Sequence, residues 1–258
     1  MCTLVLLHRP GHDWPLLLGA NRDELRTRPS RPPGRHWSDR PEVFAGLDLI
    51  GEGSWLGVND HGLVAAVLDR HASLGPQAGK RSRGELVLEA LDHAEAVAAA
   101  EALADLHPAA YRPFNLVVAD PRAAYWLRHD GGERLRVEPI PAGLHMLCAG
   151  ALDDPADPRI AAQLPRFQAA AVPDPSGADW DAWQRLLVER DAPDGQVPEA
   201  ALVQCRDDGF VTRSSALLAV PAYPGFGASP HWLHAEFEPH PGAFEVLLPE
   251  PPLTPRLN

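Results

Sequence analysis

The stretch LLLGANRDEL, residues 16–25, follows closely on the opening MCTLVLLH and begins with the same kind of short apolar run. Two such runs separated by turn-forming residues are typical of a β-hairpin. If the hairpin is centred near residue 11 or 12, the numbers of paired residues sum to about 23. Cys2 then lies opposite about Asn21, with Arg22 and Asp23 within a residue or two. The spacing predicts that a thiol and a polar cluster meet at one end of the hairpin.

Cys2 gains a specific chemistry if Met1 is removed. The residue then carries a thiol, with an ordinary pKa of about 8.5, and a free α-amine, with an ordinary pKa of about 8. The amine can accept the thiol proton, which makes one residue both nucleophile and base. Asp23 could orient this amine, and Arg22 could favour the thiolate or bind a substrate carboxylate. The alternative is that Cys2 is only a small residue at the start of a buried strand.

Blocks of strands and helices alternate along the rest of the chain. Helical runs are expected from Ser82 to about Leu106 and from Ala156 to Arg190, with a break near residues 173–177. This order predicts a layered α+β fold in which helices cover the outer faces of two packed sheets. No composition shift marks a boundary, so residues 1–258 are expected to form one domain. The expected strands are residues 3–8, 16–20, 54–58, 63–68, 114–119, 123–129, 144–150, 210–220, 231–237 and 243–248.

Local signals add detail to this pattern. Ser82 and Glu85 have the spacing of a capping box at a helix start. The proline-rich residues 28–41 are expected to form a loop. Trp180 and Trp183 have helical spacing and are expected to pack rather than to bind a ligand.

Composition and cysteine usage narrow the class of protein. The formal charge of −12 argues against a nucleic-acid groove or an anionic membrane surface, because both partners require a positive face. No stretch approaches the roughly 20 apolar residues that span a bilayer, so no integral membrane association is expected. Cys2, Cys148 and Cys205 form no CxxC pair, which indicates a reducing compartment and predicts a cytoplasmic location. Cys148 and Cys205 are expected to be buried. His231 and His234 would face opposite sides of a strand, so no metal site is expected.

Six blocks occur in a fixed order: MCTLVL, ANRDE, GSWLGVNDHGL, SRGELV, PFNLVVAD and VTRSSALL. Jointly they resemble the NRDE family, named after its tetrapeptide, whose eukaryotic members are called transport and Golgi organisation protein 2. The resemblance runs from residue 1 to about residue 220. It implies the N-terminal-nucleophile hydrolase fold, a four-layer αββα sandwich of two antiparallel sheets. It also implies similarity to the choloylglycine hydrolases and penicillin V acylases, which cleave amides with an N-terminal cysteine.

The resemblance implies roles for four residues. Cys2 matches the nucleophile, and Asp23 matches the aspartate that holds the terminal amine. Asn59 resembles the asparagine that helps to stabilise the oxyanion, a contribution of a few kcal/mol. Arg213 falls where those hydrolases carry a late active-site arginine. The family commonly has asparagine where this chain has Ala149, which predicts either a backbone N–H in its place or weakened acyl chemistry.

Asn21, Arg22 and Glu24 are the expected substrate- or ligand-binding residues. Each candidate also has a structural alternative. Arg22 and Glu24 could form an ion pair that closes the hairpin end. Arg213 could pair with a carboxylate, and Asn59 could be present only for its turn conformation.

Three functions remain open at this point. The first is a cysteine N-terminal-nucleophile amidohydrolase that acts on a small acylated amine and needs no cofactor. The second is a non-catalytic carrier or chaperone for a hydrophobic ligand, since members of the family have been linked to haem trafficking and to acyl-coenzyme A or lipid handling. Cys2, His8 or His12 would be the axial ligand of a bound haem. The third is an interaction scaffold with a dead site. The expected partner is a small molecule and not a nucleic acid, and no oligomeric state is predicted.

Overall fold

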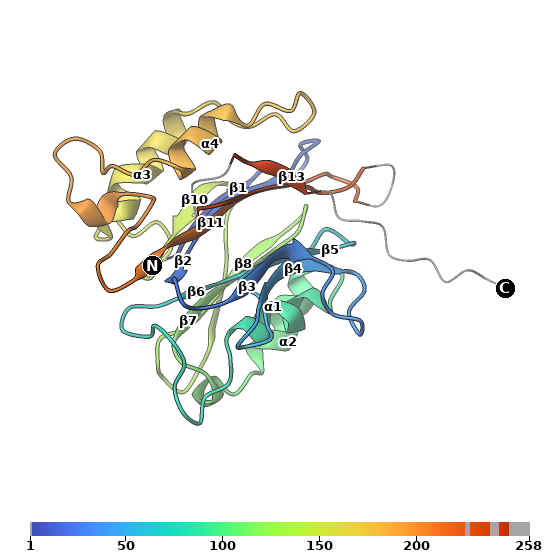
Figure 1. The fold of residues 1–258 in the computed structure, drawn as a ribbon. Coiled ribbons are helices and arrows are strands. Elements are labelled where there is room, and N and C mark those ends of the chain that lie inside the picture. Colours follow the sequence, from blue (N-terminus) through green and yellow to red (C-terminus); the bar gives the residue numbers. More distant parts are fainter. Residues whose placement is uncertain (1, 225–227, 238–242, 248–258) are drawn as a thin grey trace.

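Two antiparallel sheets packed face to face form the centre of the computed structural model, which describes residues 2–224, 228–237 and 243–247 (Figure 1). In spatial order the first sheet contains β10 (Gly143–Leu147), β1 (Thr3–His8), β2 (Leu16–Leu25), β11 (Phe210–Val220), β12 (His231–Glu236) and β13 (Glu245–Leu247). The second sheet contains β3 (Ser30–Gly34), β4 (Val43–Asp48), β5 (Leu56–Asn59), β6 (Val64–Asp69), β7 (Phe114–Ala119), β8 (Ala124–His129) and β9 (Arg136–Pro139).

Helices cover the outer face of each sheet (Figure 1). α1 (Gly84–Leu91) and α2 (Ala96–Ala104) pack on the second sheet, and α3 (Pro158–Ala169) and α4 (Asp181–Leu187) pack on the first. Short 3₁₀ helices occupy Pro108–Ala110 and Pro198–Ala200. The order helix, sheet, sheet, helix confirms the predicted α+β class and its four layers.

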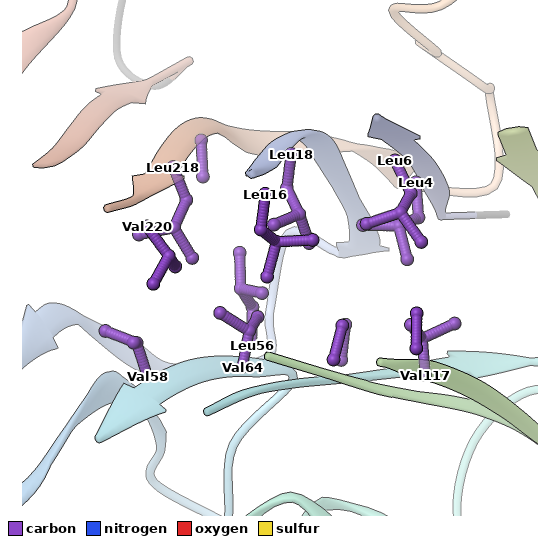
Figure 2. Packing of buried hydrophobic residues seen from close by; sticks show 14 of the residues in the cluster. Leu4, Leu6, Leu16, Leu18, Leu56, Val58, Val64, Val117, Leu218 and Val220 are labelled. Atoms are coloured by element: carbon purple, nitrogen blue, oxygen red, sulfur yellow. The ribbon is translucent and has the colours of Figure 1, made fainter. Parts of the chain in front are cut away.

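β2 is buried on both faces, because it lies in the interior of the first sheet with a layer on either side. Leu16 and Leu18 belong to the cluster between the two sheets, whereas Leu17 belongs to the cluster beneath α3 and α4. Successive side chains of a strand face opposite sides, so only an uninterrupted apolar run satisfies both layers. Figure 2 shows the inner cluster, in which leucines of β2 point across the gap toward Leu56 and Val64, and leucines of β1 point toward Val117.

Gly19 sets how closely α4 approaches β2. A Cβ atom at this position would lie 3.3 Å from Leu187 and 3.4 Å from Trp183, which is tighter than most contacts of this kind. Both side chains are fully buried against the sheet. The missing side chain therefore lets the helical layer rest directly on the strand that leads to the polar cluster.

The helical run expected from residue 82 to about residue 106 is two helices, because α1 ends at Leu91 and α2 starts at Ala96. Asn59 stabilises the break, because its side-chain amide donates to the carbonyl oxygens of Leu91 and His93 and so satisfies groups that a longer helix would use internally. The predicted capping box is also wrong. The N-cap is Arg83, without a side-chain cap, and Glu85 pairs with Arg81 instead.

Three further expectations need correction. The loop expected over residues 28–41 contains β3, which extends the second sheet by pairing with β4. Cys205 is exposed rather than buried, whereas Cys148 is buried as predicted. The strand expected to end at Leu248 is β13, which is shorter, and Leu248 lies outside the described residues.

Candidate functional site

Cys2 lies at the end of the hairpin, immediately before β1. The register pairs Thr3 with Asn21 and Leu4 with Ala20, which places Cys2 across from Arg22, one residue beyond the predicted partner. Cys2 is half-buried, and its thiol donates to the backbone carbonyl of Asp23 with an S···O distance of 3.6 Å. The predicted meeting of the thiol with the polar cluster of β2 is therefore confirmed, with a shift of one position.

The environment of Cys2 suppresses its ionisation. Burial raises the pKa of the Cys2 thiol to about 12, and the negative charge of Asp23 adds to the rise. Each unit of pKa above the ambient pH lowers the thiolate fraction about tenfold, and the thiolate is the reactive form. Cys2 is consequently a weak nucleophile unless a base removes its proton.

Successive side chains of β2 face opposite sides of the first sheet, so the polar residues from Asn21 to Glu24 are divided between its two faces. Arg22 faces the space between the sheets, where Cys2 also packs, because its guanidinium lies over the ring of Trp55, which immediately precedes β5 of the second sheet. Asp23 faces the helical layer, because its carboxylate meets Arg159 of α3. The side chains of Arg22 and Asp23 thus lie on opposite faces of the first sheet.

The Asp23 carboxylate is held by two other elements. Thr212 of β11 donates its hydroxyl to Oδ1 at 2.6 Å, and Arg159 approaches Oδ2 at 3.4 Å. Arg159 also donates to the hydroxyl of Thr3 at 2.8 Å. Asp157 fixes the start of α3 by accepting from two backbone N–H groups, which positions Arg159 next to it. Burial disfavours the charge of Arg159, yet the carboxylate of Asp23 raises its pKa above the ordinary value.

Arg159 and Thr212 were not among the site residues that the sequence predicted. Arg159 lies more than a hundred residues from Asp23 in an ordinary amphipathic helix, and Thr212 is one polar residue in a strand. The only signal in the sequence is the capping pattern DPR before a helix, which gives no indication of a contact with β2.

Arg22 is fixed by contacts from three residues. It donates to the hydroxyl of Ser30 at 3.1 Å, lies 3.8 Å from the carboxylate of Asp48, and stacks 4.1 Å from the ring centroid of Trp55. Burial lowers the pKa of Arg22, and nearby negative groups, including Cys2, oppose that effect. The structure therefore holds a cation beside the Cys2 sulfur.

The other two expected binding residues differ from each other. Glu24 lines the cavity at Cys2 and pairs with Arg28 at 3.6 Å. Arg22 pairs with Asp48, so these two ion pairs stand in place of the predicted pair of Arg22 with Glu24. The Asn21 amide faces the helical layer, where it donates to the carbonyls of Leu187 and Leu202 and accepts from the hydroxyl of Ser215. Its side chain ties β2 to that layer and does not point toward the cavity.

Asn59 has the structural role that was its alternative interpretation. Besides its bonds to the end of α1, its side-chain oxygen accepts from the backbone N–H groups of His61 and Leu63. Donors and acceptor are thus all committed to backbone atoms, and the residue does not line the cavity at Cys2. These bonds support the structural interpretation of Asn59, and its oxyanion role stays a prediction.

Arg213 lies near the cluster but outside the cavity lining. It sits at the irregularity in the pairing of β11 with β2 and donates to the carbonyl of Arg26 at 2.5 Å. Its charge reaches Arg22 and lowers the pKa of that residue further. Arg213 is thus a neighbour of the site whose described hydrogen bond joins two strand ends.

A cavity of about 290 Å³ opens beside Cys2. Its wall is formed by the ends of β2, β4 and β6, by the loop over residues 75–83 and by the start of α1. The ionisable residues that line it are Cys2, Arg22, Asp23, Glu24, Arg28, Asp48, Asp69, Lys80, Arg81, Arg83 and Arg112. Seven of these eleven residues, all but Cys2, Arg22, Asp23 and Glu24, were not among the site residues that the sequence predicted.

Asp69, at the end of β6, is a site residue that sequence reasoning missed. Burial raises the pKa of its carboxyl group, and the charge of Arg83, which lies 2.7 Å away, opposes the rise. The charges of Asp69 and Arg83 both act on Cys2. A carboxyl group with a raised pKa, at the end of β6, and a guanidinium, at the N-cap of α1, therefore lie near the thiol.

Position 149 contributes no polar side chain. Ala149 is fully buried, and the carbonyls on either side of it, of Cys148 and Gly150, accept from the amide of Asn115. Asn115 belongs to β7, so its amide ties this segment to the second sheet.

The residues proposed as haem ligands lie apart. Cys2 precedes β1 and His8 ends it, so about 20 Å of extended strand separates them at the usual rise per residue. His8 is buried, and His12 is exposed in the turn beyond. Within the described ranges, no group of three or more histidine, cysteine, aspartate or glutamate residues could hold a metal ion.

The architecture, two antiparallel sheets between helical layers, is that of the N-terminal-nucleophile hydrolases. Solved structures of that class share the fold. An N-acylethanolamine-hydrolyzing acid amidase orthologue from Caenorhabditis elegans aligns with a TM-score of 0.59 at 14% identity, covering 89% of this chain and 98% of that one. The conjugated bile acid hydrolase of Clostridium perfringens aligns with a TM-score of 0.53 at 10% identity, covering 96% and 92%.

The sequence comparison identifies the family. The family model described as Transport and Golgi organisation 2 matches residues 1–180. The chain therefore belongs to the Transport and Golgi organisation 2 family. The Bos taurus homologue is 36% identical over 117 residues and the Mus musculus homologue 31% over 115 residues. Each match spans 41% of this chain and 38% of the relative's length.

Within the part of the chain that the structure describes, no helix combines the length and the hydropathy that a bilayer crossing requires.

Proposed function

We propose that this protein is a cysteine N-terminal-nucleophile amidohydrolase that cleaves the C–N bond of a small acylated amine. The observation that carries the proposal is the position of Cys2, whose thiol lies at the edge of a cavity while the Asp23 carboxylate is fixed beside the same main-chain segment. The hydrolase architecture supports it.

The proposed reaction requires that Cys2 become the first residue. Its α-amine then accepts the thiol proton, and the sulfur attacks the amide carbonyl carbon. The tetrahedral intermediate collapses when the C–N bond breaks, and the leaving amine takes the proton back from the α-ammonium. Water then attacks the thioester, which releases the carboxylic acid and restores the thiol. Asp23 has the role of orienting the α-amine.

The negative charge that develops on sulfur and oxygen needs nearby cations. Arg22 and Arg83 supply them, because both charges already interact with Cys2. Asp69, with its raised pKa, can donate a hydrogen bond to an oxyanion when its carboxyl group is protonated. In this proposal these residues supply the oxyanion stabilisation that the side chains of Asn59 and Ala149 do not provide.

At Cys2 the carrier alternative receives less support, and the larger cavity of about 770 Å³ lies elsewhere, between the start of α3 and the segment over residues 198–206. The cavity at Cys2 is lined by charged side chains, and the apolar slot beside it measures about 20 Å³. A haem or a long acyl chain requires a far larger apolar volume, since pockets for such ligands are typically about 300–1,000 Å³. Saturable binding of haemin or of a long-chain acyl-coenzyme A would reverse this preference.

The test combines mass and turnover. The protein with Met1 removed, verified by intact mass, is incubated with a panel of N-acylated amines, and the released amines are quantified by mass spectrometry. Turnover is expected, and Cys2→Ala abolishes it. Cys205→Ala is the matched control and retains turnover, because Cys205 is exposed and does not line this cavity. Turnover that survives in Cys2→Ala, or that is absent throughout the panel, contradicts the proposal.

A further inference from the structure

Two spaces of opposite character meet at Cys2. The cavity of about 290 Å³ and the slot of about 20 Å³ are both lined by Cys2, Arg22, Trp55 and Val67. A carbonyl group attacked by the Cys2 sulfur would therefore extend its two substituents into different surroundings. The size and charge of each space define what each half of the substrate can be.

The slot is narrow and apolar. It lies between the two sheets and is lined by side chains of the inner core, among them Leu4, Leu56 and Leu68. Its volume is close to that of one water-sized sphere, which is about 10–15 Å³. A methyl group fits such a space, and a longer chain would require the core to open, which a close-packed interior resists.

The cavity is wide and cationic. Among the described residues, four acidic residues also belong to its lining, of which Asp23 turns its carboxylate toward the helical layer. The six cationic residues that line it are Arg22, Arg28, Lys80, Arg81, Arg83 and Arg112. This excess contrasts with the whole chain, whose formal charge is −12. The concentration of positive charge is thus a property of the cavity and not of the composition.

Lys80 and Arg112 contribute most to that excess. Lys80 donates to the carbonyl of Ala109 at 2.6 Å, and Arg112 donates to the carbonyls of Ala72 and Leu74. Carbonyl oxygens hold these side chains in place without cancelling their charge. Arg28, in contrast, is paired with a carboxylate at 2.6 Å. Lys80 is the only lysine in the sequence, which makes its charge simple to remove and to track.

We propose that the substrate carries an acyl group no larger than acetyl, which enters the slot, and an amine that bears an acidic group, which the cavity binds. This inference rests on the proposed hydrolase function and specifies its substrate class. The acidic group is a carboxylate or a phosphate, both of which guanidinium and ammonium groups recognise. Hydrolysis by the steps given above releases acetate and the acidic amine.

The experiment uses the processed protein and four amides. N-acetylglutamate and N-acetyl-O-phosphoethanolamine test the two acidic groups, the diamide of N-acetylglutamate is the neutral analogue, and N-octanoylglutamate tests the acyl length. Turnover of at least one acidic acetyl amide is expected, with kcat/KM at least about tenfold above the neutral amide. The octanoyl amide is expected to be inert. The preference for acidic amides should weaken as salt is added.

Variants separate the two halves of the proposal. Lys80→Gln is expected to raise KM for the acidic amide about fivefold with kcat retained, because one screened charge pair is lost. The charge-preserving variant Lys80→Arg is the control and keeps KM near its original value. Leu68→Ala widens the slot and is expected to admit a butyryl amide. Leu18→Ala, in the same core cluster but outside both lined spaces, controls for loss of stability.

The outcomes distinguish this proposal from the general one. Cleavage of the neutral or octanoyl amide as fast as the acidic acetyl amides overturns the substrate class and leaves the hydrolase function standing. Unchanged KM in Lys80→Gln overturns the assignment of the cavity to the acidic group. Inertness toward all four amides, together with turnover elsewhere in the broader panel of acylated amines, also overturns the substrate class alone. Inertness toward every amide of both panels overturns both proposals.

Discussion

The contact between Asp23 and Arg159 gives the sharpest physical prediction. Their side chains are almost fully buried, at 0% and 6% exposure, and Nη1 lies 3.4 Å from Oδ2. At that distance Coulomb's law with an effective dielectric constant of about 20 gives an attraction of about 5 kcal/mol. Removal of one partner from a buried pair costs about 3–5 kcal/mol, because the other charge is left without compensation.

The perturbation is a double-mutant cycle. Asp23→Asn keeps the shape and can still accept the hydroxyl of Thr212, while Arg159→Met keeps most of the length without the charge. Each single variant is expected to lower the free energy of unfolding by about 3–5 kcal/mol. The double variant should lose less than the sum of the two, with a coupling energy of about 1–3 kcal/mol.

Urea denaturation followed by circular dichroism measures these energies. The matched control is the pair Asp181 and Arg185 of α4, whose side chains are 75% and 73% exposed with an N···O distance of 3.7 Å. A surface pair of this kind couples by only about 0.3–0.5 kcal/mol. A coupling for Asp23 and Arg159 no larger than that of the control would refute the conclusion that their charges hold the aspartate in place.

Three other predictions test the parts of the fold that shape the site. Asn59→Ala should cost at least about 2 kcal/mol, because four backbone groups lose their partner, and a change in turnover without a change in stability would contradict that structural role. Gly53→Ala should cost about 1–3 kcal/mol, because the new Cβ would lie 2.3 Å from backbone at the start of α1, whereas Gly132→Ala, with open space around it, should be neutral in thermal melts. His145 has a pKa raised by its hydrogen bond to Asp153, so this stabilisation is complete below the unfolded pKa of about 6.5 and disappears as the pH rises through the folded value. His145→Gln should therefore lower the urea midpoint more at pH 5.5 than at pH 9, and equal losses at the two pH values would disprove the linkage.

The sequence alone determined the layered fold and the location of Cys2. Strand-length apolar runs and a short turn fixed the hairpin of β1 and β2, and the period of two carried Cys2 to the polar end of β2 with an error of one residue. The hairpin and the location of Cys2 both follow from local chain geometry, which the spacing of residues along the sequence predicts. The family blocks added the hydrolase-like architecture because they span most of the same elements.

Only the tertiary structure decided which polar residues belong to the site. Asparagine is a common residue type in binding sites, yet the side-chain amides of Asn21 and Asn59 donate hydrogen bonds to backbone carbonyls of the helical layers. Neither Arg159 nor Lys80 was predicted from the sequence. Arg159 holds the carboxylate of Asp23, and Lys80 lines the cavity at Cys2. The physical reason is that the partners of a polar side chain come from elements distant in the chain. Their identity is fixed by how layers pack and not by local spacing.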